Sequence, residues 1–183
     1  SKMHNVLVIY KQVSLQFDKD GNLLPFEGTP VHTLSYDEKP GIQAIGSTTP
    51  DLPPISNTEK GSSYMRDYEY IRYGTISLLA AIDLLTGEAI PLVSDTHKSS
   101  DFVEFLTRLD AKYPEGDKIR LILDNHSAHT SQETQRYLNN HLGRFEFVFT
   151  PTHGFWLNLV EGFFSKLTKQ MLQAVSYTHL RAH

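Results

Sequence analysis

The sequence has no cysteine, which excludes disulfide bonds and thiolate metal sites. It also contains no apolar run long enough to span a bilayer, and its first residues do not resemble a signal peptide. Basic residues are not in excess either, because 17 Lys and Arg stand against 21 Asp and Glu and give a formal net charge of −4. These features suit a protein of the reducing cytoplasm. The charge argues mildly against nucleic-acid binding, unless another part of the protein holds DNA or several acids gather at one metal site.

The chain is nevertheless long enough, at 183 residues, to form one domain with a packed core. Apolar runs bounded by turn residues predict strands at 31–36, 42–45, 74–84, 89–93, 118–123 and 145–149. Helical spacing of apolar residues predicts helices near the start of the chain, after Ser99, from Thr130 and over the stretch from Leu157 to Met171. Pro40-Gly41 reads as the turn of a hairpin between the first two strands. The fold class is therefore α/β, with a mixed sheet flanked by helices.

Three carboxylates stand at the ends of these predicted elements. Asp37 follows the first strand, Asp124 follows the strand at 118–123, and Glu161 lies in the last helix. Such hard oxygen ligands suit Mg²⁺ or Mn²⁺, and a pair of ions about 3.5–4 Å apart can activate a water or a 3′-hydroxyl and stabilise the leaving oxygen. Each acid also has a plainer interpretation, as a turn or helix-cap residue. Asp83 is a turn residue and the reserve candidate for a metal ligand.

Several other polar residues follow the candidate acids. Asn125, His126 and His129 come directly after Asp124, and His153 precedes the last helix. The H-x-x-H pair could bind zinc, but without cysteines this is a weak signal, and the histidines are better explained as cap residues or as neighbours of a phosphate. The segment 47–73 alternates tyrosines with arginines and fits either a nucleic-acid surface or a loop pinned to the core.

Five stretches together carry a family resemblance. They are S-Y-D-E-K-P-G-I-Q-A-I, T-P-D-L-P-P, Y-G-T-I-S-L-L-A-A-I-D-L-L-T-G, L-I-L-D-N-H-S-A-H and P-T-H-G-F-W-L-N-L-V-E-G-F-F-S-K-L. The chain resembles the catalytic domain of bacterial insertion-sequence transposases of the mariner-like DDE superfamily. The resemblance implies an RNase H-like fold and catalytic, metal-binding roles for Asp37, Asp124 and Glu161. It implies two Mg²⁺ ions, for which Mn²⁺ can substitute.

The same resemblance implies a cellular role and partners. The expected reaction is metal-dependent DNA strand cleavage and strand transfer, with transposon ends and a TA-type target as DNA partners. A homodimer on DNA and a bacterial, nucleoid-associated location in the cytoplasm are also expected. Two alternatives remain open: an inactive DNA- or protein-binding remnant, and another RNase H-like nuclease.

The resemblance also suggests how the chain is divided. Residues 1–30 form an N-terminal helix and linker, and residues 31–174 form the catalytic domain, which is expected to be truncated at its C-terminal end. Residues 175–183 resemble translated sequencing-adapter DNA and are treated as a non-native tail. The region that would read transposon ends is expected to lie outside this sequence.

Overall fold

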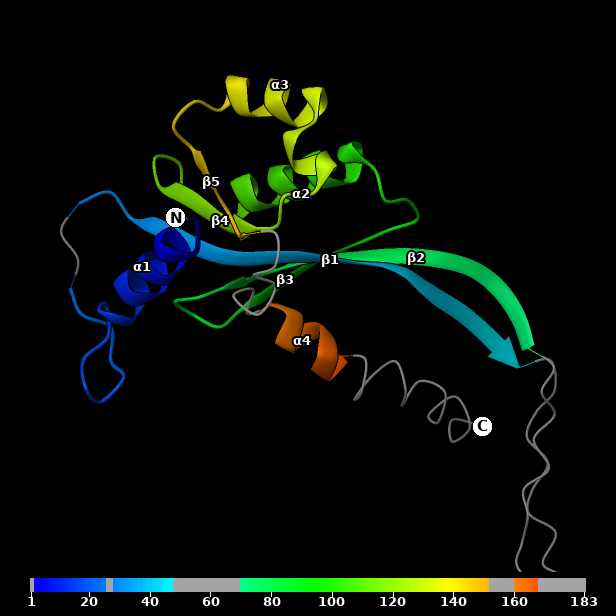
Figure 1. Ribbon diagram of the computed structural model, residues 1–183, viewed down its shortest axis with the longest axis horizontal. Coiled ribbons are helices and arrows are strands. Elements are labelled where there is room, and N and C mark those ends of the chain that lie inside the picture. Colours follow the sequence, from blue (N-terminus) through cyan, green and yellow to red (C-terminus); the bar gives the residue numbers. More distant parts are fainter. Residues whose placement is uncertain (1, 26–27, 48–69, 152–159, 168–183) are drawn as a thin grey trace, which may run out of the picture.

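The fold is a five-stranded mixed sheet with helices on both faces, seen in a computed structural model that describes residues 2–25, 28–47, 70–151 and 160–167 (Figure 1). The strand order across the sheet is β3-β2-β1-β4-β5. Neighbours β1, β2 and β3 pair antiparallel, whereas β4 and β5 run parallel to β1. The strands are β1 (Val31–Ser47), β2 (Tyr70–Asp83), β3 (Ala89–Ser94), β4 (Lys118–Leu123) and β5 (Phe145–Phe149).

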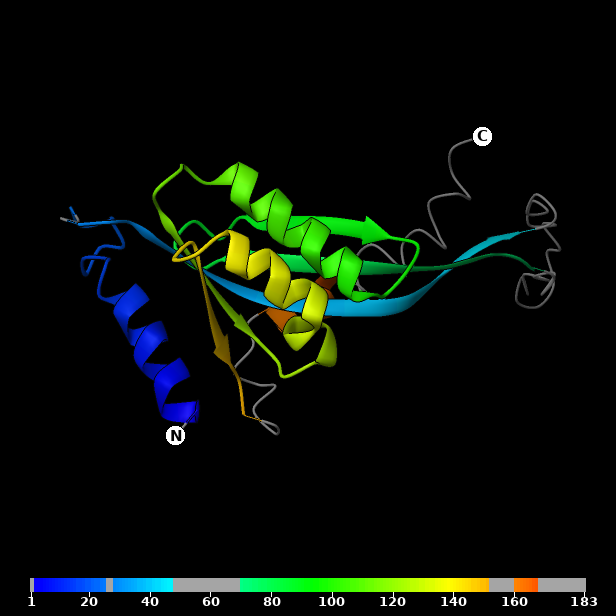
Figure 2. The same cartoon turned by 90° about the horizontal axis from the view of Figure 1, so that it is seen from above.

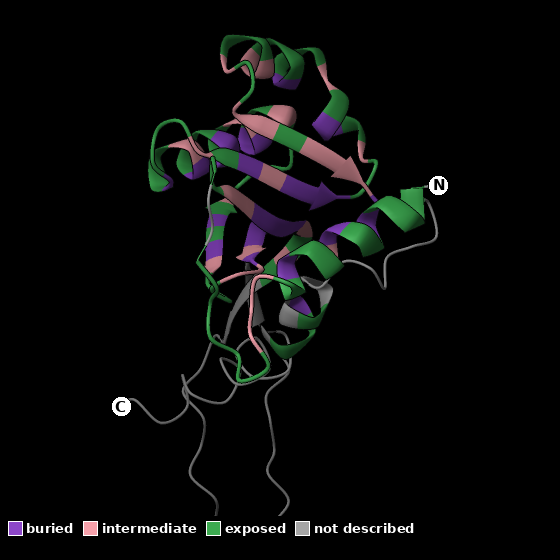
Figure 3. Cartoon of the chain, turned by 90° about the vertical axis from the view of Figure 1, so that its left-hand side faces the viewer, coloured by how far each residue is buried: buried purple, intermediate pink, exposed green. Residues whose placement is uncertain are grey.

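Two helices cover one face of the sheet, α2 (Ser99–Lys112) and α3 (Gln132–Asn140), and the short helix η1 (Ser127–Thr130) leads into α3 (Figures 1 and 2). Apolar residues recur along α2 at helical spacing, and Phe102, Phe105, Leu106 and Leu109 are fully buried. They pack against alternate residues of the strands, namely Leu34, Tyr36, Leu79, Leu121 and Leu123. This face holds the main core, and buried residues line the central strands in Figure 3.

The opposite face is covered by α1 (Lys2–Ser14) and α4 (Val160–Leu167) (Figure 1). Val6 and Ile9 of α1 pack against Ile122 of β4, and Phe164 of α4 packs against Leu78 and Ala80 of β2. Alternation along the strands explains the split, because neighbouring residues such as Leu121 and Ile122 point to opposite faces. No helix in the described part of the chain has the length and apolar character needed to cross a membrane.

The predicted hairpin at Pro40-Gly41 is wrong, because β1 is one continuous strand from Val31 to Ser47. Its pairing with β2 runs from Lys39↔Leu78 directly to Ile42↔Ile76, so the two residues form a β-bulge with one extra residue on β1. Gly41 has φ +70°, which suits glycine at such a bulge. The consequence for the site is that Asp37 lies inside a strand instead of at its end.

The other strands and helices occur close to their predicted positions, with two local differences. The helix predicted from Thr130 begins after Ser131, whose hydroxyl accepts the backbone N–H of Thr134, while Thr130 belongs to η1. Leu142, although its place in the apolar pattern of this helix would turn it inward, is 84% exposed. Gly143 follows with φ +79°, a conformation that suits glycine after the end of a helix. Most of the Tyr- and Arg-rich segment and the tail at 175–183 lie outside the described residues, so the predictions for them and for the domain boundaries stay predictions.

Candidate metal-binding and catalytic site

Two of the three predicted acids follow the end of the same strand ladder. The parallel ladder between β1 and β4 ends at Ser35↔Ile122. Two residues further along each strand come Asp37 and Asp124. Adjacent parallel strands are about 4.8 Å apart, and residues of equal register point to the same face. Both acids thus come two residues after the last paired residues of β1 and β4, near the carboxyl end of β4, where open α/β sheets bind their ligands.

The carboxylate of Asp124 is held in place from one side and open on the other. Its Oδ1 accepts the backbone N–H of His126 at 3.1 Å and lies 3.3 Å from Nδ1 of His129. The hydrogen bond from His129 lowers the pKa of Asp124 below its ordinary value, and partial burial opposes this only in part. Because 59% of the side chain is exposed, the ionised carboxylate can also reach a ligand from solvent.

His129 is the buried centre of the polar network. Only 1% of its side chain is exposed, and its ring packs 4.5 Å from that of Phe102 between centroids. Nδ1 lies 3.0 Å from the backbone oxygen of Asp124, and Nε2 lies 3.3 Å from Oε1 of Glu38. Burial alone would lower the pKa of His129, but the two carboxylates outweigh burial and raise it to about 9. The ring is therefore an imidazolium at neutral pH and donates to both acids.

Glu38 completes this network and was not predicted. Its Oε1 also accepts the hydroxyl of Tyr36 at 2.5 Å. Burial would raise the pKa of Glu38, but the hydrogen bonds from His129 and Tyr36 prevail and lower it. The pKa of Tyr36 is raised well above 10, first by burial and then by the charge of Glu38. The sequence did contain a signal for Glu38. Side chains alternate between the two faces of a strand, so Glu38 points to the same inner face as Tyr36, where a carboxylate needs hydrogen-bond partners.

The third acid, Glu161, lies in α4, and the structure describes its backbone only. Phe164, one turn later, packs on Ala80, which pairs with Asp37 across the β1–β2 ladder. Residues three apart lie on one side of a helix. The backbone of Glu161 therefore belongs to the helix that covers the sheet face carrying Asp37.

The other polar residues predicted near the site lie in different surroundings. His126 caps η1, as one interpretation predicted, although the contact from Ala128 N–H to its Nδ1 is long at 3.5 Å. Asn125 is exposed beside Asp124, and His153 lies outside the described residues. The reserve ligand Asp83 is 2% exposed and accepts hydrogen bonds from Tyr113 and from the backbone of its own turn. Those contacts give it a structural role.

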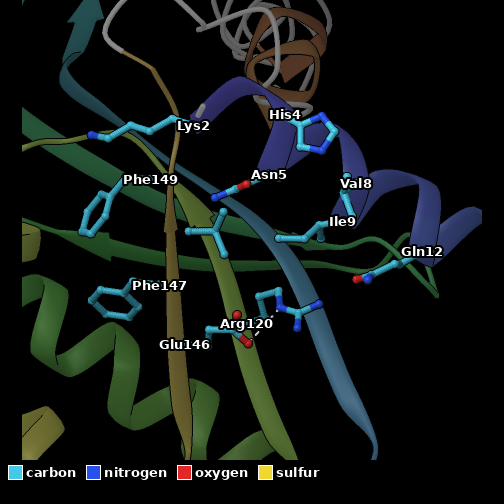
Figure 4. A pocket seen from close by; sticks show the side chains of 11 residues that line it. Lys2, His4, Asn5, Val8, Ile9, Gln12, Arg120, Glu146, Phe147 and Phe149 are labelled. Carbon is cyan, nitrogen blue, oxygen red and sulfur yellow. Dashed lines mark hydrogen bonds and ion pairs between the residues drawn. The ribbon is translucent and has the colours of Figure 1, made fainter.

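A cavity of about 570 Å³ lies elsewhere, between α1 and the edge of the sheet formed by β4 and β5 (Figure 4). Asn5 and Gln12 of α1 line it on one side, and Phe147, Arg120 and Glu146 line it on the other. Arg120 and Glu146 form an ion pair at 3.0 Å across its floor. Neither Asp37 nor Asp124 is among the described residues that line this cavity, so it is separate from these two acids.

Comparison with known proteins identifies a family. A family described as DDE superfamily endonuclease matches residues 47–181. An "Insertion element IS630 uncharacterized 39 kDa protein" from Shigella sonnei is 33% identical over 84 residues. That match covers 46% of this chain and 24% of the relative, so the chain spans only a part of the length of this curated protein.

The fold is also found among solved structures. A chain in the cryo-EM structure of the simian T-cell lymphotropic virus intasome in complex with PP2A regulatory subunit B56 gamma superposes with a TM-score of 0.55. The match covers 93% of this chain and 51% of that chain, at 12% sequence identity. At that identity the likeness concerns the fold alone, and it confirms the predicted RNase H-like α/β architecture.

Proposed function

The chain belongs to the DDE superfamily of endonucleases, and from this premise we propose that it is the catalytic domain of an insertion-sequence transposase. In this proposal Asp37, Asp124 and Glu161 are the catalytic carboxylates. The reaction is hydrolysis of a DNA strand followed by transfer of the freed 3′-hydroxyl to target DNA. Transposon ends, a TA-type target, a homodimer on DNA and a nucleoid-associated cytoplasmic location remain predictions that follow from the family resemblance.

The register of β1 against β4 is the observation that carries the proposal. It supports a site in which Asp37 and Asp124 share one edge of the sheet, and the packing of Phe164 on Ala80 supports the addition of Glu161 from α4. Three carboxylates brought together from separate elements repel one another unless cations neutralise them. This arrangement therefore favours metal binding over a purely structural role for the acids.

The donor set fits hard divalent cations. Carboxylate oxygens are the ligands that Mg²⁺ and Mn²⁺ prefer, and the lowered pKa of Asp124 keeps that ligand ionised. Two bound ions would activate the attacking water or hydroxyl and stabilise the leaving oxygen. The chain's own contribution is to orient the ligands. His129 donates a hydrogen bond to Asp124, and Glu38 holds His129 in position by accepting from its other ring nitrogen. Such supporting contacts are worth about 10–100-fold in metal affinity or activity at known metal sites.

The test is a titration of the chain with Mn²⁺, followed by the electron paramagnetic resonance signal of the free ion. Asp37→Asn, Asp124→Asn and Glu161→Gln should each weaken Mn²⁺ binding by an order of magnitude or more. Matched controls are Asp20→Asn and Glu104→Gln, which change exposed acids in the loop after α1 and on α2. These controls should bind Mn²⁺ as the unchanged chain does.

A second readout is the nicking of supercoiled plasmid in the presence of Mn²⁺ or Mg²⁺. The three acid variants should lose nicking, and the two controls should retain it. If all three variants bind Mn²⁺ and nick DNA as the unchanged chain does, the proposed acids are not the site. If binding is lost but hydrolysis of RNA–DNA hybrids is the only activity, the alternative of another RNase H-like nuclease replaces the transposase.

A further inference from the structure

A second group of metal-ligating side chains lies on the other face of β1. Glu38, His97 and His126 each offer one ligand atom, and these three atoms lie within 4.8 Å of one another. Glu38 comes from β1, His97 from the loop between β3 and α2, and His126 from the turn after β4. Alternation along β1 directs Glu38 and Asp37 to opposite faces, so this group does not share the face of Asp37, whereas His129 links Glu38 to Asp124.

The distances within the group are close to those of a coordination sphere. Nε2 of His97 lies 3.1 Å from Oε2 of Glu38. Zinc binds nitrogen and oxygen ligands at about 2.0–2.2 Å, so neighbouring ligand atoms of a tetrahedral site are roughly 3.3–3.6 Å apart. The rings of His97 and His126 are 5.3 Å apart between centroids. With all three ligand atoms within 4.8 Å of one another, small movements of the side chains would bring them to these separations.

Supporting contacts already orient the ligands. Oε1 of Glu38 accepts hydrogen bonds from Tyr36 and His129, which leaves Oε2 as the oxygen that faces His97. Hydrogen bonds to the atom of a ligand side chain that does not bind the metal are typical of metal sites in proteins. The ring of His126 accepts a long hydrogen bond of 3.5 Å from the backbone N–H of Ala128, so coordination through Nδ1 would give up very little. His129 is not a ligand, since both of its nitrogens already face carboxylate groups.

We propose that Glu38, His97 and His126 form a zinc site, with water or a further ligand in the fourth position. Two imidazoles and one carboxylate are a zinc ligand set, whereas Mg²⁺ prefers oxygen ligands alone. The two-histidine set thus separates this site chemically from the proposed carboxylate site, and the inference does not depend on the proposed function. Zinc would take the place of the direct contact between Nε2 of His97 and Oε2 of Glu38, and both atoms would bind the metal.

The site would tie three segments together next to Asp124. The backbone N–H of His126 donates to Oδ1 of Asp124, so a metal bound to the His126 ring restrains the backbone that supports this acid. Binding to the folded chain alone also raises its stability. At a zinc concentration about a hundredfold above Kd, the expected rise in Tm is roughly 5–10 °C.

The test is isothermal titration of the complete, tag-free chain with Zn²⁺, together with Co²⁺ absorption as a probe of ligand type. The unchanged chain should bind one Zn²⁺ at this site, and His97→Ala should weaken that binding by at least about tenfold. Because His97 is exposed, this variant should fold normally. The matched control is His141→Ala, which removes a partly exposed imidazole at the end of α3. The double variant Asp37→Asn/Asp124→Asn separates the two sites.

The expected pattern is loss of Zn²⁺ binding in His97→Ala, retention in His141→Ala, and retention in the double carboxylate variant, which instead loses Mn²⁺. Three results would overturn the zinc site. They are an unchanged chain that does not bind Zn²⁺, a His97→Ala variant that binds it with unchanged affinity, and loss of Zn²⁺ binding only in the double carboxylate variant. The last result would assign zinc to the carboxylates, whereas failure of the Mn²⁺ titration alone leaves the zinc site intact.

Discussion

Replacement of His129 by glutamine should remove a large, pH-dependent part of the chain's stability. In the folded chain the pKa of His129 is about 9, compared with about 6.5 for histidine in an unfolded chain. A difference of about 2.5 between these values corresponds to roughly 3 kcal/mol of stabilisation by the protonated ring. The ring is 1% exposed, so little solvent screening reduces this figure. Against a typical total of about 5–15 kcal/mol, the contribution is large.

The sign of the pH dependence follows from the raised pKa. Stabilisation by His129 is complete below about pH 6.5, falls by roughly 1.4 kcal/mol per pH unit above that value, and is gone above about pH 9. Glu38 and Asp124, whose pKa values are lowered, act in the opposite direction and lose their contribution as the solution becomes acidic. The network should therefore be most stabilising between about pH 5 and 6.5.

Urea denaturation between pH 6 and pH 9.5 measures this effect. The unchanged chain should lose roughly 3 kcal/mol of unfolding free energy over that range, and His129→Gln should show a much flatter profile. His141→Gln is the control, because it removes an imidazole that touches neither Glu38 nor Asp124. Equal slopes for the unchanged chain and His129→Gln would refute the assignment of an imidazolium to this position.

Three further changes test other parts of the fold. Gly41→Ala should destabilise the fold by about 1–2 kcal/mol, because an L side chain at φ +70° is strained even though nothing lies within 4 Å of the new Cβ. Gly162→Ala in α4 should instead stabilise the fold by up to about 1 kcal/mol, because alanine favours a helix over glycine. Urea midpoints of the two variants that move in the same direction would contradict this. Phe164→Ala should release α4 and weaken Mn²⁺ binding without any change to the acids, and Phe164→Leu should retain most of it. Tyr36→Phe should cost about 1–3 kcal/mol at pH 7, since it removes a hydrogen bond to the buried Glu38 carboxylate, and an unchanged urea midpoint would argue against that bond.

Much of the architecture could be predicted because local patterns and tertiary structure agree. The strands at 118–123 and 145–149 are apolar runs with turn residues on both sides, and both occur within one residue of their predicted limits. Asp124 was placed at a strand end for the same reason. These predictions needed only the period of the side chains and the residues that break it.

The bulge in β1 could not be predicted because Pro-Gly has two compatible structures. Proline lacks an N–H and glycine adopts positive φ, and both properties suit a turn as well as a bulge. The decisive fact is tertiary: pairing with β4 ends at Ser35, so within the described part of the chain one edge of β1 is without a strand partner at Pro40. Because that edge of the strand is unpaired, the N–H that Pro40 lacks is not needed for a hydrogen bond between strands.

The network around Glu38 was missed for a different reason. His97 and His126 meet Glu38 only because β3, β1 and β4 end near one another, and no local pattern records that meeting. The H-x-x-H spacing suggested that His126 and His129 act together. In the fold their rings lie 5.7 Å apart between centroids, but their surroundings differ, since His129 is buried between two carboxylates and His126 also lies beside His97.

Because β1 is long, its two halves should differ in how readily their hydrogen bonds open. As far as Lys39 it lies within the sheet. Among the described strands, the part from Ile42 to Ser47 pairs only with Tyr70–Ile76, as a two-stranded ribbon that extends away from the helices (Figure 1). A ribbon of this kind is only marginally stable by itself, so its amide hydrogens exchange through local opening, while those near Leu34 exchange through global unfolding. The bulge marks the boundary between the two halves. Asp37 stands just inside it, on the rigid portion, so the ribbon can open and close without displacing the acid.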